Sequence, residues 1–552
     1  MGKKRRSKKP GPGSAQTRPR ERASHGAEPS VAATPAPLAR RILPWLLAAL
    51  GGALYFLGFV GFGVWPLAFV CFMPLFFVLD SDPAPSARRA LLLGLVFGYV
   101  QQAGGYHWLV PMLQRFSGYG FFADVFFASA LWIFQALEAG FFALLYVLLR
   151  RRKLPRMVAA LVALAPLELL FPALFPTFLA NSFVEQTWLL QIVDLGGPIL
   201  LSLLALSVNV VLYELLVSLR TKGPKPTRSL VVVAALVALS LLYGVYRVNE
   251  VEARAAAAEH MRVATVQANM GLMDKRENPM EGLRRHLDAS LEVESTEHPF
   301  LIVWPESAVA SFLPEGVTDL SPYITGGLRT PILFGGLSRR DEHSYNTAFL
   351  LDVHGRILST YDKTHLLAFG EYLPFGEAFP WLYQLSPNSG RFTPGNHQRA
   401  LVLGSWRIAT LICYEDVIPE FTRSAVRSGD ANLLVNITND AWFGRSQEPW
   451  IHLSLARFRA AEQHRYLVRA TNSGVSAVVD PVGRILTRSG LFTQETLTAE
   501  VARLDDHTLF ELLGSWPGYL GLLALPVLLF WKRRAAAPAK GSQRKDEGKS
   551  SS

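Results

Sequence analysis

A strand-like run ends in a cysteine at residues 406–416, which read Trp-Arg-Ile-Ala-Thr-Leu-Ile-Cys-Tyr-Glu-Asp. The run from Trp406 to Ile412 is mostly apolar, which is typical of a buried strand. Cys413 follows directly, and we expect a helix at 419–427. A thiol at such a turn is expected to be exposed, with a pKa lowered by the helix N-terminus. The stretch therefore predicts an α/β domain with a candidate nucleophile.

Two other strand-like runs end at chemically active side chains. Glu306 follows the run 300–304 and Pro305, and Lys363 follows the run 356–360. Taken singly, each residue is more often an ordinary surface charge. Together, an acid, a lysine and a thiol that each close a strand form a set suited to acyl transfer. The carboxylate would accept the thiol proton, the thiolate would attack a carbonyl, and the ammonium would stabilise the oxyanion.

Strands and helices alternate throughout residues 250–510, where we expect a layered α/β domain. Besides the runs above, the expected strands are 262–267, 331–335, 348–352, 433–437 and 476–479, and the expected helices include 282–294 and 451–464.

Long apolar runs precede and follow this domain. Each is close to the roughly 20 residues that a helix needs to cross a bilayer. The runs are 42–60, 64–80, 90–111, 121–149, 157–176, 191–218, 229–247 and 514–531. We therefore expect about eight spans: a seven-span membrane domain at 42–249 and a final transmembrane helix at 511–534.

Basic residues lie in alternate loops between these runs, at Arg88 and Arg89, at 150–156 and at 220–228. The loops 114–120 and 176–188 are nearly free of them. Because cytoplasmic loops are enriched in Lys and Arg, both termini are expected in the cytoplasm. The domain at 250–510 is then expected on the far side of the membrane.

The composition supports a membrane protein with basic tails. Half of the 552 residues are hydrophobic and 18% are charged, against about 25% in typical soluble proteins. The net charge of +11 comes from residues 1–41 and from residues 532–552, which include the C-terminal tail 535–552. We interpret these basic residues as anchoring charge and not as a sign of a nucleic-acid-binding domain. Both tails are expected in the cytoplasm, and the first lacks any periodic pattern and is expected to be disordered.

The two cysteines, Cys71 and Cys413, exclude a disulfide framework. Nothing in the sequence indicates a metal or an organic cofactor.

Three short segments resemble the Glu-Lys-Cys triad segments of the nitrilase superfamily. They are Trp304-Pro-Glu306, Tyr361-Asp-Lys363 and Ile412-Cys-Tyr-Glu415. Within this superfamily, the membrane-embedded apolipoprotein N-acyltransferases fit best. The resemblance extends over residues 42–531, including the order of spans and soluble domain, with supporting segments at 345–348, 365–374, 439–444 and 452–474.

This resemblance implies an αββα sandwich and a two-step reaction in the bacterial inner membrane, with the catalytic domain in the periplasm. Cys413 would take a fatty acyl chain from a phospholipid as a thioester. The acyl group would then pass to the α-amino group of the N-terminal diacylglyceryl-cysteine of an apolipoprotein. The resemblance implies that Glu306 is the general base and that Lys363 stabilises the oxyanion. Glu371 matches the family's second glutamate, and Tyr414 and Glu415 match positioning residues beside the nucleophile.

One segment departs from the family pattern. Residues 267–271 read Gln-Ala-Asn-Met-Gly, and Arg276 stands where the family often has a tryptophan that lines the acyl site. The departure leaves the three triad residues in place. The head-group and acyl-chain preference is therefore not carried over to this chain.

Aromatic residues are concentrated at 366–385, which include Phe375 and Trp381, and recur at Trp442 and Phe443. Aromatic side chains suit the interface between bilayer and water, so these loops are expected to bind lipid as a lid. Ordinary core packing is the alternative.

Two acids, Glu138 and Glu168, fall within apolar runs. An acid inside a membrane has either a function or a partner within the bundle, and the sequence leaves both open. Two other functions are also left open. One is a membrane-tethered nitrilase-like amidohydrolase, and the other is a transporter or scaffold whose exported domain only binds.

Overall fold

The computed structural model describes residues 38–81, 83–116, 118–271, 278–313, 315–386 and 388–530. The chain divides into residues 1–43 and a compact unit from Pro44 to Ser552, to which the bundle and the sheets belong. Arg276 and most of the two basic tails lie outside the described residues. Helix α1 begins at Leu38, so the expected tail ends a few residues earlier than predicted.

In the described residues before 258, all regular elements are helices, which are joined by turns and loops. They are α1 (Leu38–Gly58), η1 (Trp65–Phe69), α2 (Met73–Leu79), α3 (Ala87–Gly105), α4 (Leu109–Phe116), α5 (Phe121–Arg151), α6 (Arg156–Leu170), η2 (Leu179–Phe183), α7 (Thr187–Leu190), α8 (Val193–Thr221) and α9 (Thr227–Ala257). Another apolar helix, α16 (Trp516–Phe530), comes near the end of the chain. Four of the described helices are long and apolar enough to cross a membrane: Arg41–Gly58, α5, α8 and α9. The other expected runs contain shorter or less apolar helices, so the count of eight spans stays a prediction.

Prolines explain where the helices differ from the expected runs. The run 64–80 is broken into η1 and α2, and each piece has a proline, Pro66 or Pro74, in its first turn. Proline suits that position because it has no N–H to donate. The run 157–176 ends early, at Leu170, because Pro172 disfavours a helical conformation at the residue before it.

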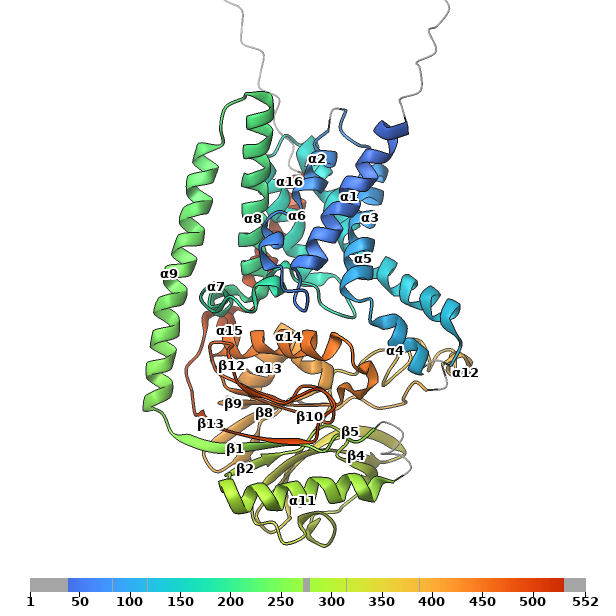
Figure 1. Ribbon diagram of the computed structural model, residues 1–552, viewed down its shortest axis with the longest axis vertical. Coiled ribbons are helices and arrows are strands. Elements are labelled where there is room, and N and C mark those ends of the chain that lie inside the picture. The colour runs from blue at the N-terminus through green and yellow to red at the C-terminus, as the bar shows by residue number, and fades with distance from the viewer. Residues whose placement is uncertain are drawn as a thin grey trace, which may run out of the picture. The chain divides into compact units, whose positions relative to one another are not determined.

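Two β-sheets lie face to face beside the bundle (Figure 1). The first has the order β13-β1-β2-β4-β5-β6, with β3 also paired to β4, and the second has the order β12-β11-β10-β9-β8-β7. The strands are β1 (His260–Gln267), β2 (Leu301–Val303), β3 (Val309–Leu313), β4 (Ile332–Arg340), β5 (His343–Leu351), β6 (Ile357–Asp362), β7 (Leu401–Leu403), β8 (Trp406–Ile412), β9 (Leu433–Thr438), β10 (Leu467–Thr471), β11 (Ala477–Val479), β12 (Ile485–Arg488) and β13 (Glu495–Ala502).

Helices cover the outer faces of both sheets. The inner faces meet in a core that joins Val303 and Leu333 of the first sheet to Ile408 and Val435 of the second. Helix α11 (Pro279–Glu297) packs on the outside of the first sheet. Helices α13 (Pro419–Gly429) and α14 (Glu448–Gln463) pack on the outside of the second. The four layers have the expected order αββα.

Helix α14 lies between the sandwich and the bundle (Figure 1). All of its residues except Trp450 are buried, because Leu453 faces the second sheet whereas Ile451 and Phe458 pack with the bundle. Polar contacts join the same two regions. Arg457 pairs with Glu185, and the Gln191 Nε2 donates to the Val482 carbonyl over 3.0 Å. The second sheet is therefore the one that lies toward the bundle.

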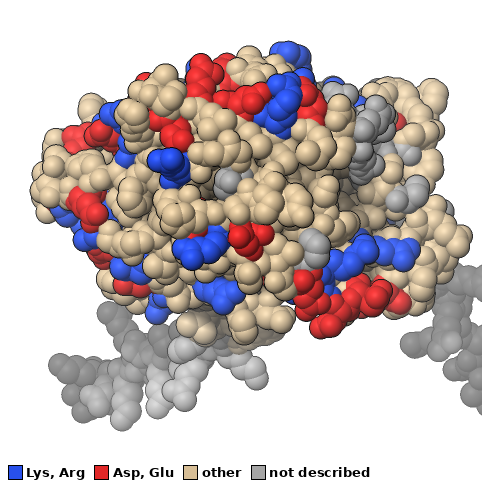
Figure 2. All heavy atoms as spheres, turned by 90° about the horizontal axis from the view of Figure 1, so that it is seen from below, with Lys and Arg blue, Asp and Glu red and all other residues tan. Residues whose placement is uncertain are grey.

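The face of the sandwich seen in Figure 2 carries acidic and basic side chains in a mixture. On helix α11, for example, Arg284 pairs with Glu281 at 2.9 Å and with Asp288 at 2.7 Å. Such a mixed surface differs from the single-sign basic field that nucleic-acid-binding domains present.

Candidate active site

The candidate nucleophile lies at a strained turn after strand β8. Cys413 has a φ of +53°, in the left-handed region that side chains other than glycine rarely adopt. The 3₁₀-helix η4 (Cys413–Val417) begins at the same residue. The Asn436 Nδ2 of β9 donates to the Cys413 carbonyl over 3.2 Å, and Cys413 contacts the cores of both the sandwich and the bundle. Strain of this kind persists where surrounding contacts hold the backbone, and it is common at functional sites.

Lys363 and two glutamates meet at the ends of the first sheet's strands. The Lys363 Nζ lies 2.7 Å from Glu371 Oε2 and 3.9 Å from Glu306 Oε1. The Asn346 Nδ2 of β5 donates to both carboxylates, over 2.7 Å to Glu306 and 3.0 Å to Glu371. All four side chains are buried or nearly so. Glu306, Lys363 and Glu371 were predicted from the sequence, whereas Asn346 was not assigned a role.

Electrostatic effects connect Cys413 to this group. Burial raises the pKa of the Cys413 thiol well above its ordinary value, the charge of Glu306 raises it further, and Lys363 opposes both. Burial disfavours the charged form of Lys363, but Glu371, Cys413 and Glu306 outweigh it and raise its pKa. The expectation of a lowered thiol pKa is wrong, because burial and the charge of Glu306 outweigh Lys363, and α13 begins only at Pro419. A thiol whose pKa is raised needs a base to form the attacking thiolate.

Glu415 joins the nucleophile turn to the end of β6 and the residues that follow it. Its Oε1 accepts hydrogen bonds from Tyr361 Oη at 2.9 Å, Thr364 N at 2.8 Å and His365 N at 2.9 Å, all beside Lys363. Its Oε2 accepts from Ile412 N at 2.8 Å. Burial raises the pKa of Glu415 to about 7, against the opposing effects of Lys363 and these bonds. The contacts are those of a residue that positions its neighbours.

Tyr414 joins the same turn to the helical bundle. Its hydroxyl donates to the Leu174 carbonyl, in the segment between α6 and η2. Its ring stacks with His365, at 5.8 Å between ring centroids, and meets Phe175 edge-on at 6.4 Å. The residue after the candidate nucleophile is therefore held partly by the bundle.

The four aromatic residues expected to bind substrate fall into two groups. Phe375 and Trp381 are 77% and 55% exposed. Phe443 is buried, 5.2 Å from Trp108 between ring centroids, and Trp442 packs partly buried against the bundle core. Phe375 and Trp381 thus have the exposure that a lid requires, whereas Phe443 takes part in core packing.

A second charged cluster, not assigned from the sequence, includes Asp416 of the nucleophile turn. The His452 Nε2 is 2.8 Å from Asp416 Oδ1, and its Nδ1 is 3.1 Å from Asp440 Oδ1. Arg469 donates to the same two carboxylates, over 2.7 Å to Asp416 and 3.1 Å to Asp440. Burial and Arg469 disfavour the charged histidine, but the two aspartates outweigh them and raise the pKa of His452 to about 10. We call these four residues the paired cluster.

Among the described residues, Asp440, Glu448 and His452 are grouped closely enough to hold a metal ion, with ligand atoms within 4.8 Å of one another. Both nitrogens of His452 already contact carboxylates, and Arg469 contacts the second oxygen of Asp440. A protonated histidine has no lone pair for a metal. The donor set therefore fits an internal ion network and not a metal site.

Comparisons with known proteins cover both halves of the chain. Residues 262–505 match the carbon-nitrogen hydrolase family, and residues 51–211 match the apolipoprotein N-acyltransferase N-terminal domain. The chain is 31% identical over 519 residues to the apolipoprotein N-acyltransferase of Geobacter metallireducens, which covers 89% of this chain and 96% of the relative. The chain belongs to the apolipoprotein N-acyltransferase family.

A second relative from this family, in Rhodopseudomonas palustris, is 31% identical over 540 residues, covering 89% of this chain and 96% of its own. Among solved structures, an amidase from Nesterenkonia is 24% identical, with a TM-score of 0.33 over 45% of this chain and 92% of its own. As a member of the apolipoprotein N-acyltransferase family, the chain is an acyltransferase with a nitrilase-superfamily catalytic domain. The family name implies lipoprotein substrates and a membrane context, and the amidohydrolase alternative is not favoured.

Proposed function

We propose that this acyltransferase moves a fatty acyl chain from a membrane phospholipid, through a thioester on Cys413, to the N-terminal diacylglyceryl-cysteine of lipoproteins. The observation that carries the proposal is the grouping of Glu306, Lys363 and Cys413, whose charges act on one another beside the helical bundle. A site next to apolar helices suits an acyl donor that lies in a bilayer.

In the first step, Glu306 accepts the proton of the Cys413 thiol as the sulfur attacks an ester carbonyl of the phospholipid. Lys363 stabilises the oxyanion that develops. The ester C–O bond then breaks, and Glu306 returns the proton to the departing glycerol oxygen. The products are a thioester on Cys413 and a lysophospholipid.

In the second step, the α-amino group of the lipoprotein attacks the thioester. Glu306 accepts a proton from the nitrogen, the C–S bond breaks, and the proton returns to the Cys413 sulfur. The product is an amide, and the enzyme is restored. Asn346 orients Glu306 and Glu371 holds Lys363 in both steps, through the short contacts they make.

The same proposal includes an orientation in the bacterial inner membrane, with the sandwich in the periplasm and both termini in the cytoplasm. The basic loop at 220–228 joins α8 to α9, at the end of α9 opposite to the sandwich (Figure 1). Since basic loops stay in the cytoplasm, the sandwich belongs on the other side. Phe375 and Trp381 then form a lid at the periplasmic surface of the bilayer.

Mass spectrometry of the intact protein tests the two steps. After incubation with phospholipid, we expect a fatty acyl mass shift that Cys413→Ala abolishes. Addition of a diacylglyceryl-cysteine peptide is expected to remove the shift and to yield an acylated peptide. A shift that decays in water without an acylated peptide would instead indicate a hydrolase, and no shift at all would refute covalent catalysis.

A further inference from the structure

One loop of the bundle contacts the residue that follows the candidate nucleophile. Residues 171–178 join α6 to η2 without regular helix or strand. The Leu174 carbonyl of this loop accepts the hydrogen bond from the Tyr414 hydroxyl, and the Phe175 ring packs on the Tyr414 ring. Since Tyr414 directly follows Cys413, the path of this loop affects the position of the nucleophile turn.

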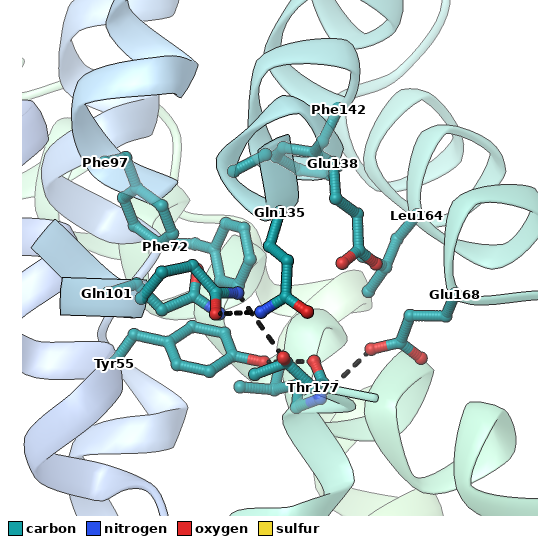
Figure 3. A pocket seen from close by; sticks show the side chains of 13 residues that line it. Tyr55, Phe72, Phe97, Gln101, Gln135, Glu138, Phe142, Leu164, Glu168 and Thr177 are labelled. Carbon is teal, nitrogen blue, oxygen red and sulfur yellow. Dashed lines mark hydrogen bonds between the residues drawn. The ribbon is translucent and has the colours of Figure 1, made fainter. Parts of the chain in front are cut away.

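Side chains of the bundle, and not a regular ladder of backbone bonds, fix the path of this loop. Figure 3 shows Tyr55 and Thr177 in contact. The Gln135 Oε1 of α5 accepts from Phe175 N over 2.9 Å. The Thr177 hydroxyl donates to the Phe175 carbonyl over 3.0 Å, and the Tyr55 hydroxyl donates to the Thr177 carbonyl over 3.0 Å. Irregular backbone among apolar helices needs such partners, because no bulk water is there to supply them.

The hydrogen bonds around Gln135 form a closed ring. The Gln135 Nε2 donates to Gln102 Oε1 over 2.8 Å, and the Gln102 Nε2 donates to Thr177 Oγ1 over 3.3 Å. The Thr177 hydroxyl donates to the Phe175 carbonyl, and Phe175 N donates to Gln135 Oε1, which closes the ring. Both glutamines are 1% exposed. Because each amide uses its oxygen and its nitrogen within the ring, a change at Gln135 leaves several buried groups unpaired.

The cavity beside this ring is too small to be a lipid site. Its volume is about 20 Å³, and Glu138 and Glu168 also line it (Figure 3). That space holds roughly one water molecule and no acyl chain. The Glu168 Oε1 accepts from Leu179 N over 3.0 Å, just beyond the other end of the loop. Glu168 thus holds the backbone next to the loop, as Gln135 and Tyr55 hold the loop itself.

We infer that Gln135 is a positioning residue for the acyl-transfer site, acting through the loop 171–178 and Tyr414 on Cys413. This inference rests on the proposed function. Gln135 fixes the Phe175 N–H, the adjacent Leu174 carbonyl holds Tyr414, and Tyr414 sets the strained turn at Cys413. An intramembrane glutamine therefore controls the geometry of a thiol outside its own domain.

The test measures single-turnover acylation of Cys413 by phospholipid in the full-length protein. Gln135→Leu removes the hydrogen bonds to Phe175 N and to Gln102 Oε1. We expect the rate constant to fall roughly tenfold through the loss of the bond to Phe175, with the concentration of phospholipid for half-maximal rate unchanged. In a Tyr414→Phe background, the same change is expected to have little further effect, because the link to Leu174 is already broken. Thr177→Val removes another bond of the ring and is expected to act in the same direction, so it carries the test if Gln135→Leu does not fold.

Asn209→Leu is the matched control. The Asn209 side chain also binds backbone groups, Phe72 N at 2.9 Å and the Ala68 carbonyl at 2.8 Å, and takes no part in the ring of hydrogen bonds around Gln135. We expect it to lower thermal stability without slowing acylation. The inference would be overturned if Asn209→Leu slowed acylation as much as Gln135→Leu does. It would also be overturned if Gln135→Leu slowed acylation by the same factor in the Tyr414→Phe background as in the wild type. A wild-type protein that never becomes acylated would instead overturn the proposed function on which it rests.

Discussion

Two charged clusters each contain a residue of the turn that begins at Cys413, and they differ in how their charges are matched. In the paired cluster, His452 and Arg469 each bridge the carboxylates of Asp416 and Asp440. In the other cluster, which we call the triad cluster (Glu306, Lys363, Glu371 and Cys413), Lys363 is close to Glu371 but 3.9 Å from Glu306, beyond hydrogen-bond distance. The difference teaches that buried charge alone does not identify catalysis. The triad cluster differs in that it brings an acid, an ammonium and a thiol together, which is the set that acyl transfer uses.

The largest expected effect is on activity, in the triad cluster. Glu306→Gln keeps the size of the side chain but removes the base, so acylation of Cys413 is expected to slow by about 10²–10⁴-fold. The midpoint of thermal unfolding is expected to stay within a few degrees of wild type. The rate of acylation is measured by stopping the incubation with phospholipid at successive times and recording the mass of the intact protein. A variant that acylates at the wild-type rate would remove Glu306 from the mechanism.

The next effect is on stability, in the paired cluster. Arg469→Met leaves two buried carboxylates with one cation between them, and the loss of one partner of a buried ion network costs about 3–5 kcal/mol. Thermal unfolding in detergent measures the change, with Glu306→Gln as the comparison. If Arg469→Met were as stable as Glu306→Gln, the distinction between the clusters would fail.

A smaller effect concerns pH and His452. Asp416, Asp440, Glu448 and Arg469 face this histidine, and its pKa of about 10 lies above the ordinary value of about 6.5. Between these values the folded protein holds a proton that the unfolded chain has lost. The stabilisation is therefore complete below about pH 6.5 and is lost as the pH rises toward 10. Thermal midpoints of wild type should fall over this range, and those of His452→Gln should fall less; parallel curves would contradict the assignment.

The smallest effect is expected at the aromatic residues outside both clusters. Phe375→Ser and Trp381→Ser together are expected to slow acylation by phospholipid vesicles several-fold, because the exposed rings no longer enter the bilayer. Arg284→Ala, on the mixed face of the sandwich, serves as the control and is expected to have no effect. The idea of a lid would be abandoned if the double variant Phe375→Ser and Trp381→Ser were acylated at the same rate as the control Arg284→Ala.

The sequence was sufficient to predict the triad cluster because local pattern determines it. Strand β8 ends at Ile412 as predicted, and β2 and β6 end one residue before and two residues after the predicted positions 304 and 360. Glu306, Lys363 and Cys413 follow these strands as expected. The resemblance to a known family supplied Glu371 and Glu415. The alternation of strands and helices predicted a layered α/β domain, and the resemblance supplied the order αββα.

The paired cluster and the Gln135 ring could not be predicted in the same way. Asp416 meets His452 and Arg469 at separations of 36 and 53 residues, and Gln135 meets Phe175 at 40. Hydrogen bonds between such distant residues depend on how elements pack, which local periodicity does not encode. The available signal was a polar residue inside an apolar run, such as Arg469 in β10 or Gln135 in α5. That signal shows that a partner must exist, but it does not say which residue the partner is.

The pairing of β1 with β13 has a consequence for biosynthesis. The two strands pair along their whole lengths, from His260 beside Ala502 to Gln267 beside Glu495. β1 is the first strand of the domain to be synthesised and β13 is the last, so one edge of β1 has no partner until the ribosome has passed the end of the domain. An open strand edge invites wrong pairing, and distant contacts form slowly. Since α16 begins at Trp516, the sheet closes at about the time when the last apolar helix is made.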